Sequence, residues 1–86
     1  MYVVAYDITN NKERKKIADI LNNYGERVQK SVFVCDIKFN TFDKLKNQLE
    51  RQTIKTGNVH IWLTQSPPWK IGAEETMPEK KWVHCL

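Results

Sequence analysis

Extended apolar segments alternate with amphipathic segments along this chain, and this order constrains its fold more than any other feature. β-prone residues at 2–6, 27–38 and 59–63 predict three strands, and the first of these runs is apolar throughout, as in a buried central strand. Helical patterns fill the intervals between the strands. A chain with this order is expected to form an α+β sandwich with its helices on one face of the sheet.

The first predicted helix follows the strand at 2–6. Asn10, with Glu13 three residues later, resembles a capping box, in which two side chains satisfy backbone amides at a helix start. The apolar face consists of Ile17, Ile20, Leu21 and Tyr24. Gly25 stands where a helix commonly ends. The segment is therefore expected to be an amphipathic helix that packs on the sheet.

The second predicted helix begins at Asn40 and Thr41, which are expected to cap it, and it ends before Gly57. Its core face consists of Phe42, Leu45 and Leu49. After the strand at 59–63, prolines break the pattern, and residues 69–71 are suited to one more edge strand. We therefore expect a domain over 1–72 and a tail over 73–86 that packs on its own dimer or on a partner.

Size and composition limit the possible functions. The 86 residues form one small domain, whose marginal core would benefit from dimerisation. The net charge of +4 permits a polyanionic partner. No apolar run approaches the ~20 residues of a membrane-spanning helix, and the N-terminus lacks a signal peptide's basic region. With only two cysteines, the chain is expected to be cytoplasmic and without membrane partners.

Asp7 is the first candidate functional residue. It follows the apolar strand, where the end of a sheet can hold a carboxylate rigidly and accessibly. Mg²⁺ or Mn²⁺ often takes only one or two protein carboxylates, and a two-fold dimer would supply a second copy of Asp7. The alternative is that Asp7 only caps the turn that follows.

Basic residues are concentrated between positions 10 and 30, where six of them stand against three acidic ones. They are Lys12, Arg14, Lys15, Lys16, Arg27 and Lys30. Such groups can bind the phosphates of a nucleic acid. A solvated helix face explains the cluster equally well.

Other polar and aromatic features carry less information. The cysteines and histidines lack zinc-ligand spacing, and Ser31 has no recognisable triad partner. Trp62 and Trp69 could stack on bases, although packing in a core or an interface is the more common role of tryptophan.

Two strings in the first half of the chain resemble the CRISPR-associated Cas2 family. These are Tyr6-Asp7-Ile8 and, after Arg14, the run Tyr24-Gly25-Glu26-Arg27-Val28-Gln29-Lys30-Ser31-Val32-Phe33. The resemblance is good over 2–38, whereas only the helix–strand pattern agrees over 39–63. The chain departs from the usual pattern at Val34, where an acidic residue is common, and at 60–62.

The resemblance implies a ferredoxin-like βαββαβ fold and a homodimer in which an extra C-terminal strand joins the neighbour's sheet. It also implies that the segment at 27–38 breaks near Lys30 into two strands, and that Mg²⁺ or Mn²⁺ lies between two copies of Asp7. Catalytic positions carried over from the family are Asp7, Tyr6, Arg14, Arg27, Ser31 and Phe33, with Lys16 replacing an arginine.

The implied function is metal-dependent endonuclease activity on RNA or double-stranded DNA, together with bridging of Cas1 integrase dimers during spacer acquisition. A scaffold that binds DNA without cleaving it is one alternative. Another is a small RNA-binding or toxin-type ferredoxin-like module outside any CRISPR system.

Overall fold

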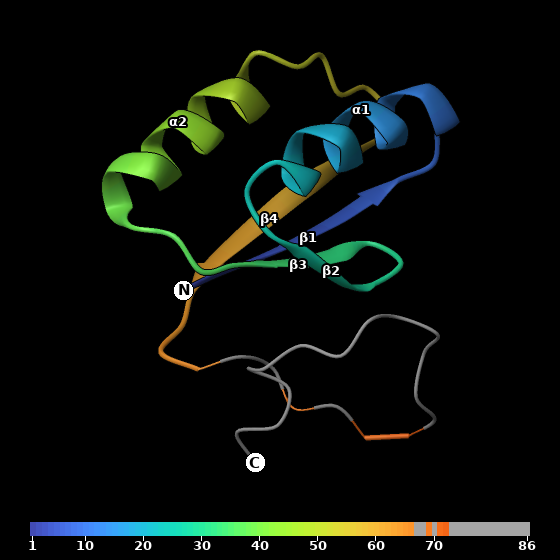
Figure 1. The fold of residues 1–86 in the computed structure, drawn as a ribbon. Coiled ribbons are helices and arrows are strands. Elements are labelled where there is room, and N and C mark those ends of the chain that lie inside the picture. The colour runs from blue at the N-terminus through green and yellow to red at the C-terminus, as the bar shows by residue number, and fades with distance from the viewer. Residues whose placement is uncertain (67–68, 70, 73–86) are drawn as a thin grey trace.

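The computed structural model describes residues 1–66, 69, 71 and 72. Its elements in chain order are β1 (Tyr2–Ile8), α1 (Asn11–Asn22), β2 (Glu26–Gln29), β3 (Val32–Cys35), α2 (Phe39–Glu50) and β4 (Gly57–Leu63). The strands form one antiparallel sheet in the order β2-β3-β1-β4 (Figure 1). The expected α+β fold and the central position of the first strand are confirmed.

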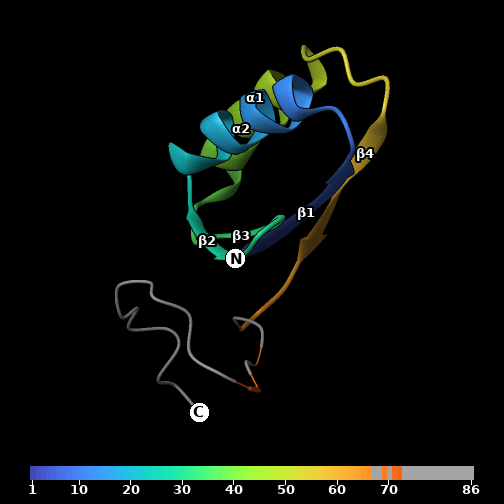
Figure 2. The same cartoon turned by 90° about the vertical axis from the view of Figure 1, so that its right-hand side faces the viewer.

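Both helices lie on one face of the sheet, as Figure 2 shows from the side. Successive side chains of a strand point to opposite faces, and β1 accordingly alternates between buried and more exposed residues. Tyr2, Val4, Tyr6 and Ile8 are buried on the helix side. Val3, Ala5 and Asp7 therefore belong to the opposite face, which we call the open face because no helix of the described residues covers it.

The core lies between the helices and the sheet. Its fully buried side chains are Phe33, Ile17, Leu21, Leu45, Val4 and Cys35. Tyr2 of β1 and Phe42 of α2 stack with their ring centroids 3.9 Å apart, which joins the second helix to the central strand. The predicted apolar faces of both helices thus contribute to a single core.

The ends of the helices differ from the sequence-based prediction. Asn10 caps α1 as expected, because its side chain accepts a hydrogen bond from the Glu13 amide at 3.0 Å. However, the helix ends at Asn22 with Asn23 as its C-cap, so Gly25 lies two residues beyond the cap rather than directly after it. The predicted cap of α2 is wrong: its N-cap is Lys38, and Asn40 lies within the first turn.

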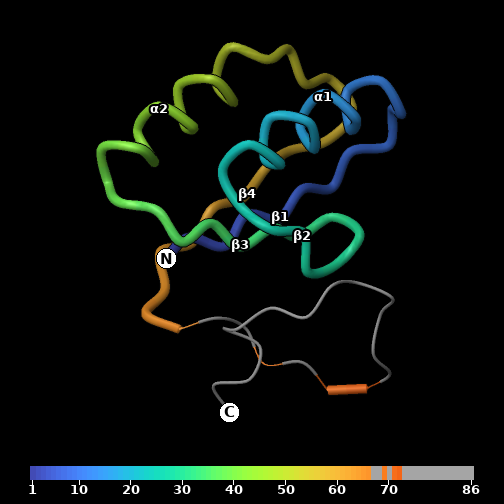
Figure 3. The backbone as a smooth tube through the Cα atoms, in the orientation of Figure 1, coloured from blue at the N-terminus to red at the C-terminus, as the bar shows by residue number. Residues whose placement is uncertain are grey.

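The segment at 27–38 is a hairpin rather than one strand (Figure 3). The chain reverses at Lys30 and Ser31, and β3 ends at Cys35. The prediction of one continuous strand is wrong because apolar periodicity does not register a reversal without glycine, proline or asparagine at the turn. The break implied by the family resemblance is confirmed.

The C-terminal predictions concern residues that are largely outside the described part of the chain. Lys70 and the tail at 73–86 are not described, and neither Trp69 nor Ile71 belongs to a strand. The extra strand at 69–71, the domain limit at 72 and the packing of the tail therefore remain predictions.

Substituting Gly25 by alanine is expected to destabilise the fold. An added Cβ would lie 2.3 Å from the Val34 carbonyl oxygen and 2.6 Å from the Cys35 sulfur, so the backbone would have to shift. Overpacking of this kind costs roughly 1–3 kcal/mol. Urea unfolding of Gly25→Ala should show this loss, whereas Asn23→Ala, at a neighbouring exposed position, should unfold close to the parent. Equal midpoints for the two variants would contradict the close packing of Gly25 on β3.

Candidate functional site

Asp7 lies one residue before the end of β1, on the open face of the sheet. Its side chain is exposed and has no hydrogen bond or ion pair with any residue that the structure describes. It does not cap the following turn, since Asn10 fills that role for α1. The alternative reading of Asp7 as a capping residue is therefore wrong, and its carboxylate is available to a ligand.

The backbone of Asp7 is held firmly, although no described residue binds its side chain. Asp7 pairs with Asn58 across β1 and β4, and the next pair is Ile8 with Gly57. Gly57 lies so close that an added Cβ would stand 1.7 Å from the Asp7 carbonyl oxygen. Glycine at 57 thus permits β4 to approach the end of β1, and the approach fixes the base of the Asp7 side chain.

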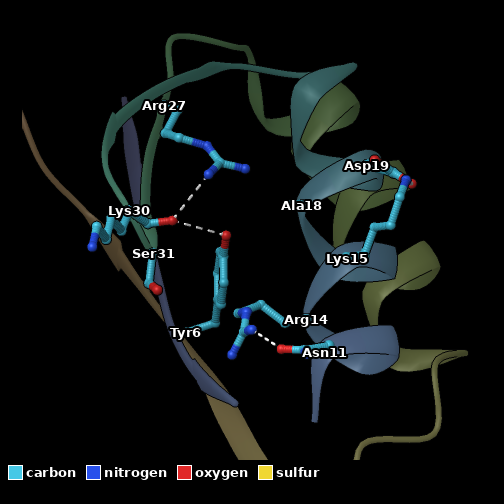
Figure 4. A pocket seen from close by; sticks show the side chains of 9 residues that line it. All are labelled: Tyr6, Asn11, Arg14, Lys15, Ala18, Asp19, Arg27, Lys30 and Ser31. Carbon is cyan, nitrogen blue, oxygen red and sulfur yellow. Dashed lines mark hydrogen bonds and ion pairs between the residues drawn. The ribbon is translucent and has the colours of Figure 1, made fainter. Parts of the chain in front are cut away.

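A second group of predicted residues lines a pocket of about 680 Å³ between α1 and the β2–β3 hairpin (Figure 4). The lining residues are Tyr6, Asn11, Arg14, Lys15, Ala18, Asp19, Arg27, Lys30 and Ser31. Six of these were candidates from the sequence, and they come from β1, α1, β2 and the turn between β2 and β3. The pocket is of a size that accommodates a small ligand or part of a larger one.

The hairpin side of the pocket is organised around the Lys30 carbonyl oxygen. Arg27 Nη1 donates to it at 3.3 Å, and the Tyr6 hydroxyl donates to it at 3.2 Å. The Arg27 guanidinium also lies over the Phe33 ring, with Cζ 5.2 Å from the ring centroid. These contacts hold the Arg27 guanidinium toward α1, as Figure 4 shows.

On the helix side, Arg14 contacts the turn between β1 and α1. Its Nη1 atom donates to the Ile8 carbonyl at 2.9 Å and to the Thr9 carbonyl at 3.5 Å. Its Nη2 atom also donates to the Asn11 side chain. Arg14 therefore stabilises the turn after Asp7 while presenting positive charge to the pocket.

The structure separates Asp7 from the other predicted site residues. Tyr6 and Asp7 are neighbours in β1 and point to opposite faces of the sheet, so the pocket lies on the helix side and Asp7 on the open side. A single chain therefore does not bring the Asp7 carboxylate into the pocket. Because successive side chains of a strand point to opposite faces, the sequence already implies that Tyr6 and Asp7 are separated. The family motif, which names both residues together, does not show this separation.

Phe33 and Tyr6 contribute to the site from the core. Phe33 is 0% exposed and Tyr6 is 5% exposed. The expectation that Phe33 is a catalytic residue requires correction, because no atom of its ring is accessible to a substrate. Its contribution is positional, as the apolar surface beneath Arg27.

The lysines of α1 are directed outward. Lys12, Lys15 and Lys16 are exposed, and Lys15 forms an ion pair with Asp19 at 2.9 Å. In Figure 4 the side chains of Lys15 and Asp19 point away from the hairpin. This pair neutralises part of the helix charge, so the guanidiniums of Arg14 and Arg27 dominate inside the pocket.

Glu13 is an acidic residue whose role sequence reasoning missed. Its carboxylate does not return to the Asn10 amide, as a capping box requires, but accepts hydrogen bonds from Thr56 Oγ1 at 2.8 Å and from the Lys55 and Thr56 amides at 3.2 Å. The bond from the Thr56 hydroxyl, followed by those from the amides, lowers the pKa of Glu13. These partners lie more than forty residues away and leave no local sequence signal.

The carboxylate of Asp7 has the chemistry to bind a divalent cation, but the described residues of one chain do not form a complete metal site. Among the described residues, no group of three or more His, Cys, Asp or Glu side chains could hold a metal ion. A free carboxylate is nevertheless the ligand that Mg²⁺ and Mn²⁺ prefer, and these ions retain water or take phosphate oxygens at their other positions. The donor set therefore suits an ion shared between two copies of Asp7.

Two further side chains are less suited to a role in the site. Burial raises the pKa of the Cys35 thiol to about 11, so Cys35 is a poor nucleophile. Trp62 pairs with Val3 on the open face and stacks on His60 with ring centroids 5.9 Å apart.

None of the described helices is long and apolar enough to cross a membrane.

Comparison with known proteins agrees with this fold and these residues. A sequence model of the family described as CRISPR associated protein Cas2 matches residues 1–69. A protein of Synechocystis sp. named CRISPR-associated endoribonuclease Cas2 3 is 47% identical over 51 residues, which cover 59% of this chain and 55% of that protein. A Thermus thermophilus protein named CRISPR-associated endonuclease Cas2 2 is 43% identical over 51 residues, covering 59% of this chain and 57% of that one.

Among solved structures, the crystal structure of Streptococcus pyogenes Cas2 at pH 6.5 superposes with a TM-score of 0.67 at 29% identity, covering 73% of this chain and 83% of that one. The chain spans little more than half the length of the two relatives above. The family match nevertheless extends through every helix and strand that the structure describes. The chain belongs to the CRISPR-associated Cas2 family.

Proposed function

We propose that this chain is a subunit of a metal-dependent endonuclease that cleaves RNA or double-stranded DNA and acts as a homodimer. The observation that carries the proposal is the carboxylate of Asp7, which is exposed and has no partner among the described residues, at the end of the central strand and on the open face of the sheet. The names of the relatives, endoribonuclease and endonuclease, support the reaction class. Membership of the family disfavours a module outside CRISPR systems.

A second copy would complete the site through the open face. Beyond the polar Asn58 and His60, which pair with Asp7 and Ala5, this face carries apolar side chains, namely Val3, Ala5, Val32, Val34 and Trp62. An apolar surface of this kind is suited to an isologous contact, in which the same patch is used by both subunits. Two copies packed face to face would bring their Asp7 carboxylates to the symmetry axis, where they would hold Mg²⁺ or Mn²⁺.

The division of work between residues follows from their positions. When bound, the cation would polarise a phosphoryl oxygen and lower the pKa of a water molecule. Asp7 would hold the cation, and Arg14 and Arg27 would bind phosphate charge from the pocket. Because the pocket and Asp7 lie on opposite faces of β1, they suit different phosphates of one nucleic acid.

Arg27→Ala should weaken nucleic-acid binding in a salt-dependent manner. Each phosphate contact contributes about 0.7–0.9 to the slope of log K against log salt concentration, so loss of one contact should reduce the slope by roughly that amount. Fluorescence anisotropy from 50 to 300 mM salt would measure it. Lys44→Ala, at an exposed position of α2 away from the pocket, should leave the slope unchanged. Equal slopes for both variants would exclude Arg27 as a phosphate ligand.

A bridge between Cas1 integrase dimers is a second function for the same fold. The exposed lysines of α1 at positions 12, 15 and 16 favour it, since they lie on a helix surface that a duplex can approach. Comparing Asp7→Asn with Lys12→Ala/Lys16→Ala in a spacer-acquisition assay would separate the functions. Acquisition that survives Asp7→Asn but fails in the lysine variant would assign acquisition to DNA binding alone.

A further inference from the structure

We propose that Thr56 and Glu13 form a latch that positions Asp7, and that both act as positioning residues for the metal-dependent reaction. This inference rests on the proposed function, because the two residues would act by positioning Asp7, the proposed ligand of the cation. We use the name Thr56 latch for these two residues together with two sets of hydrogen bonds. One set joins Thr56 to Glu13, and the other joins Thr56 to the turn at 9–10. The two residues lie 43 positions apart, and neither is in the pocket.

Thr56 satisfies the turn that follows Asp7 through both its backbone and its side chain. Its carbonyl oxygen accepts from the Thr9 amide at 3.3 Å and from the Thr9 hydroxyl at 3.2 Å. Its own hydroxyl accepts from the Asn10 amide at 3.0 Å and donates to Glu13 Oε1 at 2.8 Å. The hydroxyl thus uses both its acceptor and its donor capacity, which serine and threonine provide in a single oxygen atom.

Glu13 holds Thr56 in place from the first turn of α1. Its carboxylate accepts from the Lys55 and Thr56 amides, so the loop that enters β4 is bound at successive positions. The Glu13 amide in turn is capped by Asn10. A closed ring of hydrogen bonds therefore joins the start of α1, the turn after β1 and the loop before β4.

The residue after Thr56 carries this restraint to Asp7. Gly57 contacts the Asp7 carbonyl so closely that no side chain would fit between the strands. Any displacement of Thr56 would move Gly57 and with it the Asp7 backbone. Arg14 binds the Ile8 carbonyl from the helix side at 2.9 Å, so the Asp7 backbone is restrained on both sides while its carboxylate has no partner in 1–66, 69, 71 and 72. Groups that orient a metal ligand in this way commonly affect affinity and activity by about 10–100-fold when removed.

Thr56→Val tests the latch, because it removes the hydroxyl and preserves the shape of the side chain. The affinity for Mn²⁺, measured by calorimetry on the intact protein, should fall by about tenfold or more, with a lower kcat and an unchanged KM for the nucleic acid. Exchange of the Thr9 amide with solvent deuterium should become faster. Thr56→Ser should restore all three quantities toward those of the parent.

Tyr24→Phe is the matched control, since it removes a hydroxyl that accepts a tertiary hydrogen bond, from Gln48 Nε2 at 2.8 Å, outside the latch. A Mn²⁺ affinity and a kcat of Thr56→Val within twofold of this control would overturn the latch.

If Thr56→Val fails to fold, Glu13→Gln replaces it, with the same expected losses and the same criterion. Asp7→Ala separates the two proposals: if it keeps Mn²⁺ binding and cleavage, the proposed function fails and the latch with it. If Asp7→Ala loses both Mn²⁺ binding and cleavage while Thr56→Val keeps both, the latch is overturned and the proposed function stands.

Discussion

Asp7→Ala should lose metal-dependent cleavage of nucleic acid by at least about a hundredfold, because it removes the carboxylate that would hold the cation. The fold should persist, since the Asp7 side chain is exposed and makes no contact that a described element requires. Initial rates with Mg²⁺ and with Mn²⁺, on a single-stranded RNA and on a DNA duplex, would measure the effect. Asp7→Asn, which keeps the shape of the side chain, should behave similarly.

Asp43→Ala provides the comparison for this prediction. Asp43 is an exposed aspartate of α2, on the helix layer rather than on the open face. Its removal changes the net charge by the same amount and should leave cleavage unaltered. A rate for Asp7→Ala equal to that of Asp43→Ala would remove Asp7 from the mechanism, whatever its position in the fold.

Phe33→Ala should destabilise the protein by about 3–5 kcal/mol, because it leaves a large cavity in the centre of the core. Phe33 is fully buried and lies against Tyr6, with ring centroids 6.3 Å apart. Small domains have total stabilities near the lower end of about 5–15 kcal/mol, so a substantial unfolded fraction is expected. Thermal and urea unfolding would measure the loss, and nuclease activity should fall in parallel with the folded fraction.

Two other substitutions separate packing from a role in catalysis. Phe39→Ala removes the same ring at a position that is 72% exposed and should change stability little. Phe33→Leu refills most of the core but removes the aromatic face beneath Arg27, so it should retain most of the stability and weaken nucleic-acid binding. A Phe33→Leu variant that is fully stable yet wholly inactive at saturating nucleic acid would contradict a positional role.

Most of the fold could be predicted from the sequence because its elements are strongly patterned. The apolar run of β1, the spacing of Ile17 and Leu21 in α1 and the alternation of β4 each match one structural period. The predictions failed where a local signal was missing or misleading. The Lys30–Ser31 reversal has no glycine or proline, and Asn40 lies two residues after Lys38, the N-cap of α2.

The candidate site was predicted as a set of residues but not as an arrangement. The resemblance to the family identified Tyr6, Asp7, Arg14 and Arg27, and the structure places the pocket residues among them together. It did not reveal that Asp7 lies on the other face of β1, nor that Glu13 reaches Thr56. The alternation of side chains along a strand already implies the first separation. The contact between Glu13 and Thr56 joins segments 43 residues apart, and neither spacing nor composition encodes it.

Counting bound Mn²⁺ per chain tests the central claim most directly, since an ion shared by two Asp7 carboxylates has a defined stoichiometry. Calorimetric titration of the protein, with its mass in solution measured by ultracentrifugation, should show a dimer that binds one Mn²⁺ for every two chains. Asp7→Asn should remain a dimer and lose that binding. One ion per chain, a monomer that binds Mn²⁺ as tightly, or unchanged binding in Asp7→Asn would contradict a site shared across the symmetry axis.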